Sequence, residues 1–221
     1  MIKNFQNIFF NSKYNFFHQK KNSNKNLLMV DRERLDVSII NSLFGLAISE
    51  KHNLNILVLT DLDKNNLIIK VFKKLGLNKV IFGANKAKYV LNLYQSIKSL
   101  ILSIHALINI FIYKFPWLIK NYKVNGILIG DLIYDTNIKF SNRYLDPKID
   151  YKLFQFLFVG TFRAFYINKI MNNNNVSKVI VGTQNYSFNS GIALRISCYN
   201  NISSYYLHGL SFKKIHLKKE T

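Results

Sequence analysis

The sequence predicts an α/β protein with a doubly wound, mostly parallel Rossmann-like sheet flanked by helices. Short apolar runs of strand length alternate with longer amphipathic stretches along most of the chain. The connections between them are short, and the strand-length runs are apolar without interruption, as in strands that are buried on both faces of a sheet. Strand, helix and strand in this order favour right-handed crossovers between parallel strands.

The first half of the chain supplies three of the expected strands. In order, it predicts a strand over 26–31, a helix over 35–53, a strand over 54–61, a helix over 64–77 and a strand over 78–83. The second of these helices is expected to end at Gly76, a natural C-cap. The apolar face of the first is expected to comprise Val37, Ile40, Leu43, Phe44, Ala47 and Ile48.

The second half repeats the same alternation after a long helical region. It predicts a helix over 86–114, a short strand leading into a loop or helix within 126–140, a helix over 151–171, a strand over 177–183, a helix over 188–200 and a strand over 202–209. Residues 1–26 show no clear period and predict an irregular or partly helical lead-in. We therefore expect one Rossmann-like domain over 27–221.

The formal net charge is +20, which raises the question of a nucleic-acid partner. The positive residues are 26 Lys against 5 Arg, and they are scattered rather than clustered. With 29 Asn and 28 Ile, the composition is what A+T-rich codons supply. Nucleic-acid readers rely more on Arg interleaved with aromatic residues, so no nucleic-acid partner is predicted. Attraction to an anionic membrane surface fits the charge better.

Three features indicate the compartment. The single cysteine, Cys198, excludes an internal disulfide and favours a reducing environment; on its helix we expect it to be a small buried residue. The start of the chain has no secretory signal pattern. The most apolar run, 89–115, contains Lys98 and His105, which favours a core or membrane-lying helix over a spanning one. We expect a cytoplasmic protein, peripheral at the inner face of the membrane.

The common catalytic signatures are missing from the sequence. No GxGxxG follows the first predicted strand, and there is no GxxxxGK[ST], GxSxG or HExxH. The five histidines are isolated from one another, so no metal site is predicted. We also expect no cofactor to be bound by this chain.

Polar and small residues follow the predicted strands. Because ligands of parallel α/β sheets bind outside the carboxyl ends of the strands, these residues predict a crevice for a hydroxyl-rich ligand. They are Asp31, Arg32, Thr60, Asp61, Gly83, Gly130, Asp131, Gly182 to Asn185, His208 and Gly209. The alternative is that Asp61 and Thr183 simply cap the following helices.

The stretch GILIGDLIYDTNIKF, residues 126–140, places two acids four residues apart in a chain with only 11 acidic residues. If 130–138 is helical, Asp131 and Asp135 share one face, with Tyr134 beside them and Lys139 one turn on. One interpretation is a solvated helix start favoured by the helix dipole. The other is a binding ledge whose carboxylates accept sugar hydroxyls, with Asp131 or Asp135 as general base.

This stretch resembles the Gly-Asp-Leu-Ile-Tyr-Asp signature of bacterial capsular and surface polysaccharide biosynthesis proteins, which are glycosyltransferase-like. That signature usually continues Thr-Tyr-Leu-Arg, whereas this chain has Thr136, Asn137, Ile138 and Lys139. The later stretch VIVGTQNYSFNSGIALRISCYNNISSYYLHG is similar to the second block of the same family. Matching positions there are Asn185, Tyr186, Gly191 and Arg195.

The resemblance covers roughly residues 27–210 and implies the acceptor-side half of a GT-B architecture. In that architecture a second domain binds the donor, a nucleotide sugar, at strand ends and helix N-termini. On this reading the chain carries the acceptor-binding half, the donor-binding half belongs to another domain or chain, and the partner is a glycan or lipid-linked acceptor.

The resemblance also assigns roles to individual residues. Asp131, Tyr134 and Asp135 would line the acceptor crevice, and Asn185, Tyr186 and Arg195 would lie across it. Arg195 would meet an anionic sugar or phosphate, or else pair with a nearby acid. Apart from the resemblance, His208 at the end of the last predicted strand is a candidate general acid or base, with a structural role as the alternative. The alternative for the whole chain is a non-catalytic domain that binds glycan or partner.

Overall fold

The structure, a computed structural model, describes residues 23–31, 35–63, 65–82, 92–141, 148–182, 190–208 and 211–215. Its central element is a six-stranded sheet in the order β3-β2-β1-β6-β7-β8. The strands are β1 Asn26–Val30, β2 Asn55–Thr60, β3 Val80–Phe82, β6 Val176–Val181, β7 Ser203–His208 and β8 Ser211–Ile215. The first five in the sheet are parallel, and β8 pairs with β7 in antiparallel register. The α/β, doubly wound prediction is confirmed.

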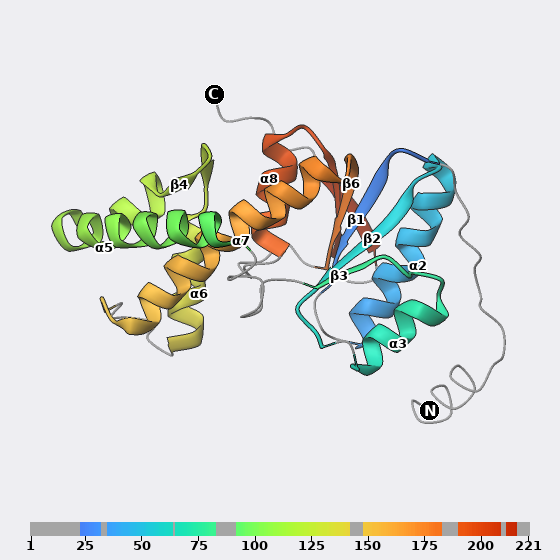
Figure 1. The fold of residues 1–221 in the computed structure, drawn as a ribbon, viewed down its shortest axis with the longest axis horizontal. Coiled ribbons are helices and arrows are strands. Elements are labelled where there is room, and N and C mark those ends of the chain that lie inside the picture. The colour runs from blue at the N-terminus through green and yellow to red at the C-terminus, as the bar shows by residue number, and fades with distance from the viewer. Residues whose placement is uncertain are drawn as a thin grey trace.

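Helices cover both faces of this sheet because its central strands are apolar on both. In β1, Leu27 and Met29 join one hydrophobic cluster with α2 (Leu35–His52) and α3 (Leu67–Lys74). The alternate residues Leu28 and Val30 join a second cluster with α7 (Tyr151–Asn173) and α8 (Ser190–Tyr199). The period-2 alternation of side chains along a strand thus supplies two separate cores. Figure 1 shows α2 and α3 on one side of the strands and α7 and α8 on the other.

The strand order reverses between β1 and β6. From β1 the chain passes through α2 and α3 outward to β3, whereas from β6 it passes through α8 outward to β7. Such a reversal is the topological switch point at which α/β proteins commonly bind ligands.

The segment between β3 and β6 forms a helical lobe beside the sheet (Figure 1). We define the helical lobe as α5 (Leu93–Asn121), the hairpin β4–β5 (Lys123–Val124 and Ile127–Leu128), α6 (Gly130–Ser141) and the first half of α7. Helix α7 also packs on the sheet, since Phe162, Phe165 and Ile170 belong to the core there. It therefore connects the lobe to the sheet.

Helix α5 contains a sharp break. Lys114 has φ 66° and ψ −176°, so an upstream helix and a short downstream helix meet there, and Pro116 lies in the first turn of the downstream one. The predicted helix over 86–114 therefore ends at this break, and the short downstream helix was not predicted; the start of the prediction, 86–91, lies outside the described residues.

The prediction for the buried face of α2 is wrong in part, although Val37 and Ile48 are buried and Phe44 packs against the core as expected. Ile40 and Leu43 are exposed, whereas the residues packed on the sheet are mainly small and polar. They include Ser38, Asn41, Ser42, Gly45 and Ser49. Small side chains let the helix lie close to the sheet, which bulkier residues at these positions would prevent.

The hairpin and strand β8 were not predicted. The hairpin turns at Asn125 and Gly126, with φ values of 51° and 80°, the left-handed conformation that Asn-Gly adopts in tight hairpins. Residues 1–22 of the predicted lead-in lie outside the described residues.

Candidate functional site

The candidate site begins at the junction between the hairpin and α6. The backbone N–H groups of Ile129 and Gly130 both donate to the carbonyl of Tyr122, at 3.1 Å each. A Cβ atom on Gly130 would lie 1.8 Å from the carbonyl oxygen of Leu118. The start of α6 can therefore approach the end of α5 only because residue 130 is glycine. This contact fixes the first turn of α6, and with it the position of Asp131.

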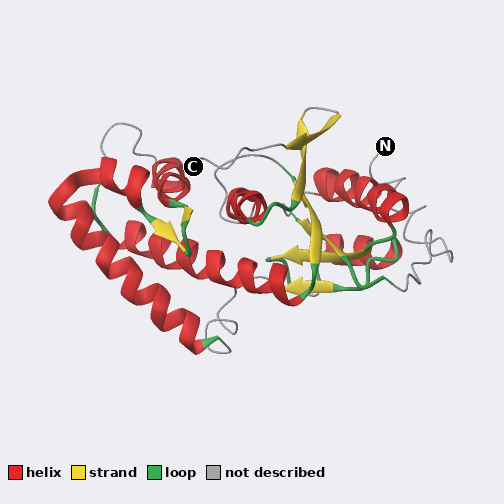
Figure 2. Cartoon of the chain, turned by 90° about the horizontal axis from the view of Figure 1, so that it is seen from above, coloured by secondary structure: helices red, strands yellow, loops and turns green. Residues whose placement is uncertain are grey.

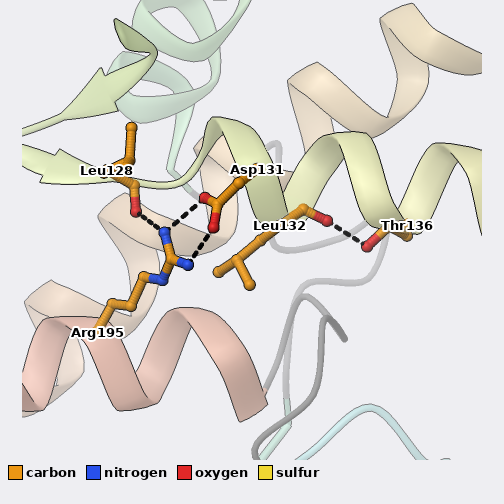
Figure 3. A network of polar contacts seen from close by, with 5 residues as sticks. All are labelled: Leu128, Asp131, Leu132, Thr136 and Arg195. Atoms are coloured by element: carbon orange, nitrogen blue, oxygen red, sulfur yellow. Dashed lines mark hydrogen bonds and ion pairs between the residues drawn. The ribbon is translucent and has the colours of Figure 1, made fainter. Parts of the chain in front are cut away.

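Asp131 forms a bidentate ion pair with Arg195 of α8, and Figure 3 shows the arrangement. One guanidinium nitrogen, Nη1, donates to Asp131 Oδ1 at 2.5 Å and to the carbonyl oxygen of Leu128 at 2.6 Å. The other, Nη2, donates to Asp131 Oδ2. Both side chains are a little under one third exposed. Planar guanidinium and carboxylate groups match in this geometry, which holds α6 and α8 in a fixed relation.

The pair decides between the two interpretations of Arg195. It pairs with a nearby acid. Both carboxylate oxygens of Asp131 are likewise engaged. Of the two acids in this stretch, Asp131 therefore has the geometry of a positioning residue.

Asp135 lies one turn further along the same face of α6. It is exposed, and its side chain makes neither a hydrogen bond nor an ion pair with any described residue. Partial burial raises the pKa of its carboxyl above the usual value; the charge of Asp131 raises it further, and that of Arg195 lowers it. The predicted helix over 130–138 is confirmed, and Asp135 is its accessible acid.

Tyr134 points toward the hydrophobic core of the lobe. It is half-buried, and its ring lies 5.6 Å, centroid to centroid, from the ring of Phe115. On the same helix, Thr136 is buried and its hydroxyl donates to the carbonyl of Leu132 at 2.6 Å (Figure 3). The ring of Tyr134 thus belongs partly to the core of the lobe, whereas the neighbouring Asp135 is exposed.

One part of the predicted crevice is wrong. Gly130 and Asp131 do not lie at the carboxyl edge of the parallel sheet, because the strand before them, β5, pairs with β4 in a separate two-stranded sheet. The link of Asp131 to the elements around the main sheet is its ion pair with Arg195 of α8. Its place in the site comes from helix packing rather than from a strand end.

The remaining predicted site residues belong to the second block of the sequence. Asn185 and Tyr186 lie outside the described residues. His208 ends β7, opposite Ser211 of β8, and its side chain is not described. Cys198 lies half-buried on α8, where burial raises the pKa of its thiol and disfavours the reactive thiolate.

A second polar group lies near the switch point. Asp31 follows β1 and is buried; its carboxylate accepts hydrogen bonds from Ser38 at 2.5 Å and from Thr60 at 3.1 Å. These bonds tie the ends of β1 and β2 to the start of α2. Asp31 and Thr60 were predicted as strand-end residues, but the hydrogen bond from Ser38 is visible only in the structure.

Asp61, the next residue after β2, forms an ion pair with Arg163 of α7. Close by, the hydroxyl of Tyr166 donates to the carbonyl of Phe82 at 3.2 Å. Burial, and to a lesser extent the charge of Asp61, raises the pKa of Tyr166. Arg163 carried no signal in the sequence, since nothing marks which residue of a long aromatic helix faces a strand end.

Within the described ranges, no three His, Cys, Asp or Glu side chains gather closely enough to hold a metal ion. No model of a known protein family matches the chain, and comparison with curated proteins and with solved structures also finds no match.

Proposed function

We propose that this protein is the acceptor-binding domain of a glycosyltransferase of capsular or surface polysaccharide biosynthesis. One observation carries the proposal. The two segments that resemble this family meet through the ion pair between Asp131 and Arg195, which are 64 positions apart in the chain, and leave Asp135 exposed beside it. The resemblance gives the reaction class, and the contact supports treating the two segments as one site.

In this function Asp135 receives the acceptor. An exposed carboxylate accepts hydrogen bonds from sugar hydroxyls, and in transfer it takes the proton of the attacking hydroxyl as general base. A base needs a pKa nearer to neutral than that of an ordinary aspartate, and partial burial and the neighbouring Asp131 shift Asp135 in that direction. Asp131 and Arg195 position it by holding the first turn of α6 against α8.

The donor of the complete enzyme is a nucleotide sugar, which we assign to a separate donor-binding domain or chain. We also propose that Asn185 and Tyr186 contact the acceptor and that His208 assists proton transfer. Because a growing polysaccharide is commonly lipid-linked, the proposed place of work is the cytoplasmic face of the membrane.

The proposal is tested by titrating the protein with a panel of oligosaccharides in a calorimeter. Binding that varies little with salt is expected, since hydroxyl hydrogen bonds carry it. Asp135→Asn should weaken binding about 10-fold or more, because a hydrogen bond to a charged group contributes about 1.5–3 kcal/mol. The control is Glu50→Gln, which removes one exposed acid at the far end of α2.

Two outcomes would count against the proposal. If Asp135→Asn binds as tightly as the unchanged protein, this carboxylate does not contact the acceptor. If no saccharide binds but DNA or RNA does, with an affinity that falls steeply with salt, the charge rather than the site governs the partner. Saccharide binding without transfer, even with donor and donor-binding partner present, would leave a non-catalytic glycan-binding domain.

A further inference from the structure

The outward face of α5 is apolar over the whole upstream part of the helix. Ten large apolar side chains between Leu93 and Tyr113 are exposed, among them Tyr94 at 77% and Phe111 at 72%. The members that share one face are Leu93, Tyr94, Ile97, Leu100, Ile101, Ile104, Ile108, Phe111 and Ile112. We call these nine residues the α5 outer face. Their spacing of three and four residues makes a continuous stripe along the helix.

The inward face of the same helix combines small residues with Ile110, which is also fully buried. Ser99, Ser103 and Ala106 are fully buried and pack toward α6 and α7. The hydroxyls of the two serines donate to backbone carbonyls one turn earlier, at 2.6 and 2.7 Å. Most of the large apolar residues of the upstream helix thus lie outside and its small residues inside, unlike the arrangement in a core helix of a water-soluble domain. A monomeric protein rarely exposes so large an apolar patch unless the patch is a contact surface.

The charge along α5 identifies the kind of surface that it fits. The segment 93–121 contains no Asp or Glu, and its cations Lys98, Lys114 and Lys120 are exposed. The amino group of Lys114 lies 6.0 Å from the ring centre of Phe111, a member of the outer face. One cation therefore adjoins the apolar stripe at its downstream end, and the exposed Lys98, whose amino group lies 5.0 Å from the ring centre of Phe165 on α7, lies further upstream. The net charge of the whole chain is +20. An apolar stripe with cations beside it is typical of helices that lie in the headgroup layer of an anionic membrane.

A spanning arrangement does not fit the packing. Among the described helices, α5 alone has the length and apolar composition to cross a membrane. Its inner face, however, packs against α6 and α7, and a helix in that setting presents only one side to lipid. In Figure 2 it forms the outer edge of the helical lobe, along the flank of the molecule.

A second copy of the chain fits less well. Two α5 outer faces placed together would bring the bordering lysines of both copies near one another with no acid on either helix to offset them. An anionic bilayer supplies both an apolar layer and the opposite charge.

We propose that α5 docks the protein on anionic membranes, lying parallel to the surface with its outer face among the lipid headgroups and upper acyl chains. The upstream part of the helix, from Leu93 to Tyr113, would then contact lipid over roughly 30 Å. This inference goes beyond glycan binding and does not depend on it, because no residue of the α5 outer face belongs to the Asp135 site.

The test is sedimentation of the full chain with vesicles of phosphatidylcholine, with and without phosphatidylglycerol. We expect binding to the mixed vesicles, weaker binding to phosphatidylcholine alone, and a decrease at high salt. Ile104→Asp combined with Ile108→Asp, in the middle of the outer face, should lower the partition coefficient at least about 10-fold. Since both side chains are about half exposed, circular dichroism and thermal unfolding should show an intact fold.

Two further variants define what binds. Ile40→Asp combined with Leu43→Asp is the matched control, with the same charge change at exposed apolar positions of α2. It should bind nearly as well as the unchanged protein. Lys98→Gln combined with Lys114→Gln should weaken binding to mixed vesicles about 10-fold or more, and binding to phosphatidylcholine much less.

Three results would overturn the proposal. The first is an equal loss in the α2 and α5 aspartate variants, which would show that overall charge drives vesicle binding. The second is equal binding to both kinds of vesicle. The third is that neither the unchanged protein nor the α5 variant binds vesicles, whether the protein is monomeric or dimeric in solution. Loss of saccharide binding in Asp135→Asn with vesicle binding intact would keep the two proposals separate.

Discussion

Asp135 is influenced by two neighbouring side chains of opposite charge. Asp131 raises the pKa of its carboxyl and Arg195 lowers it, after the larger effect of partial burial. We therefore expect Arg195→Gln to raise the pKa of Asp135 further and Asp131→Asn to lower it. The measurement is an NMR titration of the Asp135 side-chain carboxyl carbon in each variant, with Glu50→Gln as a remote control. Shifts in the same direction for both variants would contradict the arrangement.

At this scale the sequence predicted how the two acids lie on α6 but not which residue pairs with Asp131. Helical spacing placed Asp131 and Asp135 on one face, and the structure confirms it. That Arg195 pairs with Asp131 depends on α6 and α8 lying side by side, which no local pattern encodes. Tyr134 packs on Phe115, a residue that follows the break at Lys114, and this break could not be read from the residues either.

Among the secondary-structure elements, the start of α6 depends on a single glycine. Because a Cβ on Gly130 would overlap the Leu118 carbonyl oxygen, Gly130→Ala should force α6 away from α5 and destabilise the protein by about 1–3 kcal/mol or more. Denaturant unfolding of the variant measures the loss, and the ion pair between Asp131 and Arg195 should weaken with it.

The matched control is Gly45→Ala in α2. There a Cβ would meet the side chains of Ile180, Ile56 and Met29 at ordinary contact distances of 3.6–3.8 Å. Since alanine favours a helix interior over glycine by about 1 kcal/mol, this variant should be as stable as the unchanged protein or more so. Equal losses at both positions would show that the close approach at Gly130 is not what requires glycine.

Strands and helices with strong periodicity were predictable, and those held by long-range contacts were not. The five parallel strands appear close to their expected bounds because each is a buried apolar run. The α2 face was assigned in part to the wrong residues, because the helix buries three serines and a glycine beside Val37 and Ile48 while Ile40 and Leu43 are exposed. The hairpin was missed although Asn125-Gly126 is a strong turn signal, since its strands are only two residues each.

Across the whole molecule, the doubly wound sheet follows from apolar runs that supply both faces, and so it could be predicted. The helical lobe could not, because it depends on α5, α6 and α7 packing together through residues far apart in the chain. The exposed apolar face of α5 illustrates the limit. The composition of this apolar run fits a core helix and a membrane-lying helix equally well. Only the structure shows which of its side chains face outward.

One buried contact inside the lobe should make the stability of the whole protein depend on pH. The hydroxyls of Tyr122 and Thr161 lie 2.6 Å apart, joining the end of α5 to α7. Burial raises the pKa of Tyr122 from 10.0 to about 12, although its hydrogen bonds to Thr161 and Ser103 oppose the change. Above pH 10 the unfolded chain releases the phenolic proton while the folded protein retains it. The free energy of unfolding should therefore fall between pH 10 and pH 12, by about 2–3 kcal/mol.

Tyr122→Phe removes this contribution and isolates it from the titration of the many lysines, which occurs in both proteins. The variant should be less stable at neutral pH by about 1 kcal/mol, from the lost hydrogen bond. The two unfolding curves, measured in urea from pH 9 to pH 12, should then converge and cross as the pH rises. Tyr94→Phe, at an exposed position of α5, should follow the unchanged protein throughout. Parallel curves for Tyr122→Phe and the unchanged protein would mean that this hydroxyl titrates alike in the folded and unfolded chain, and so is not buried as the structure has it.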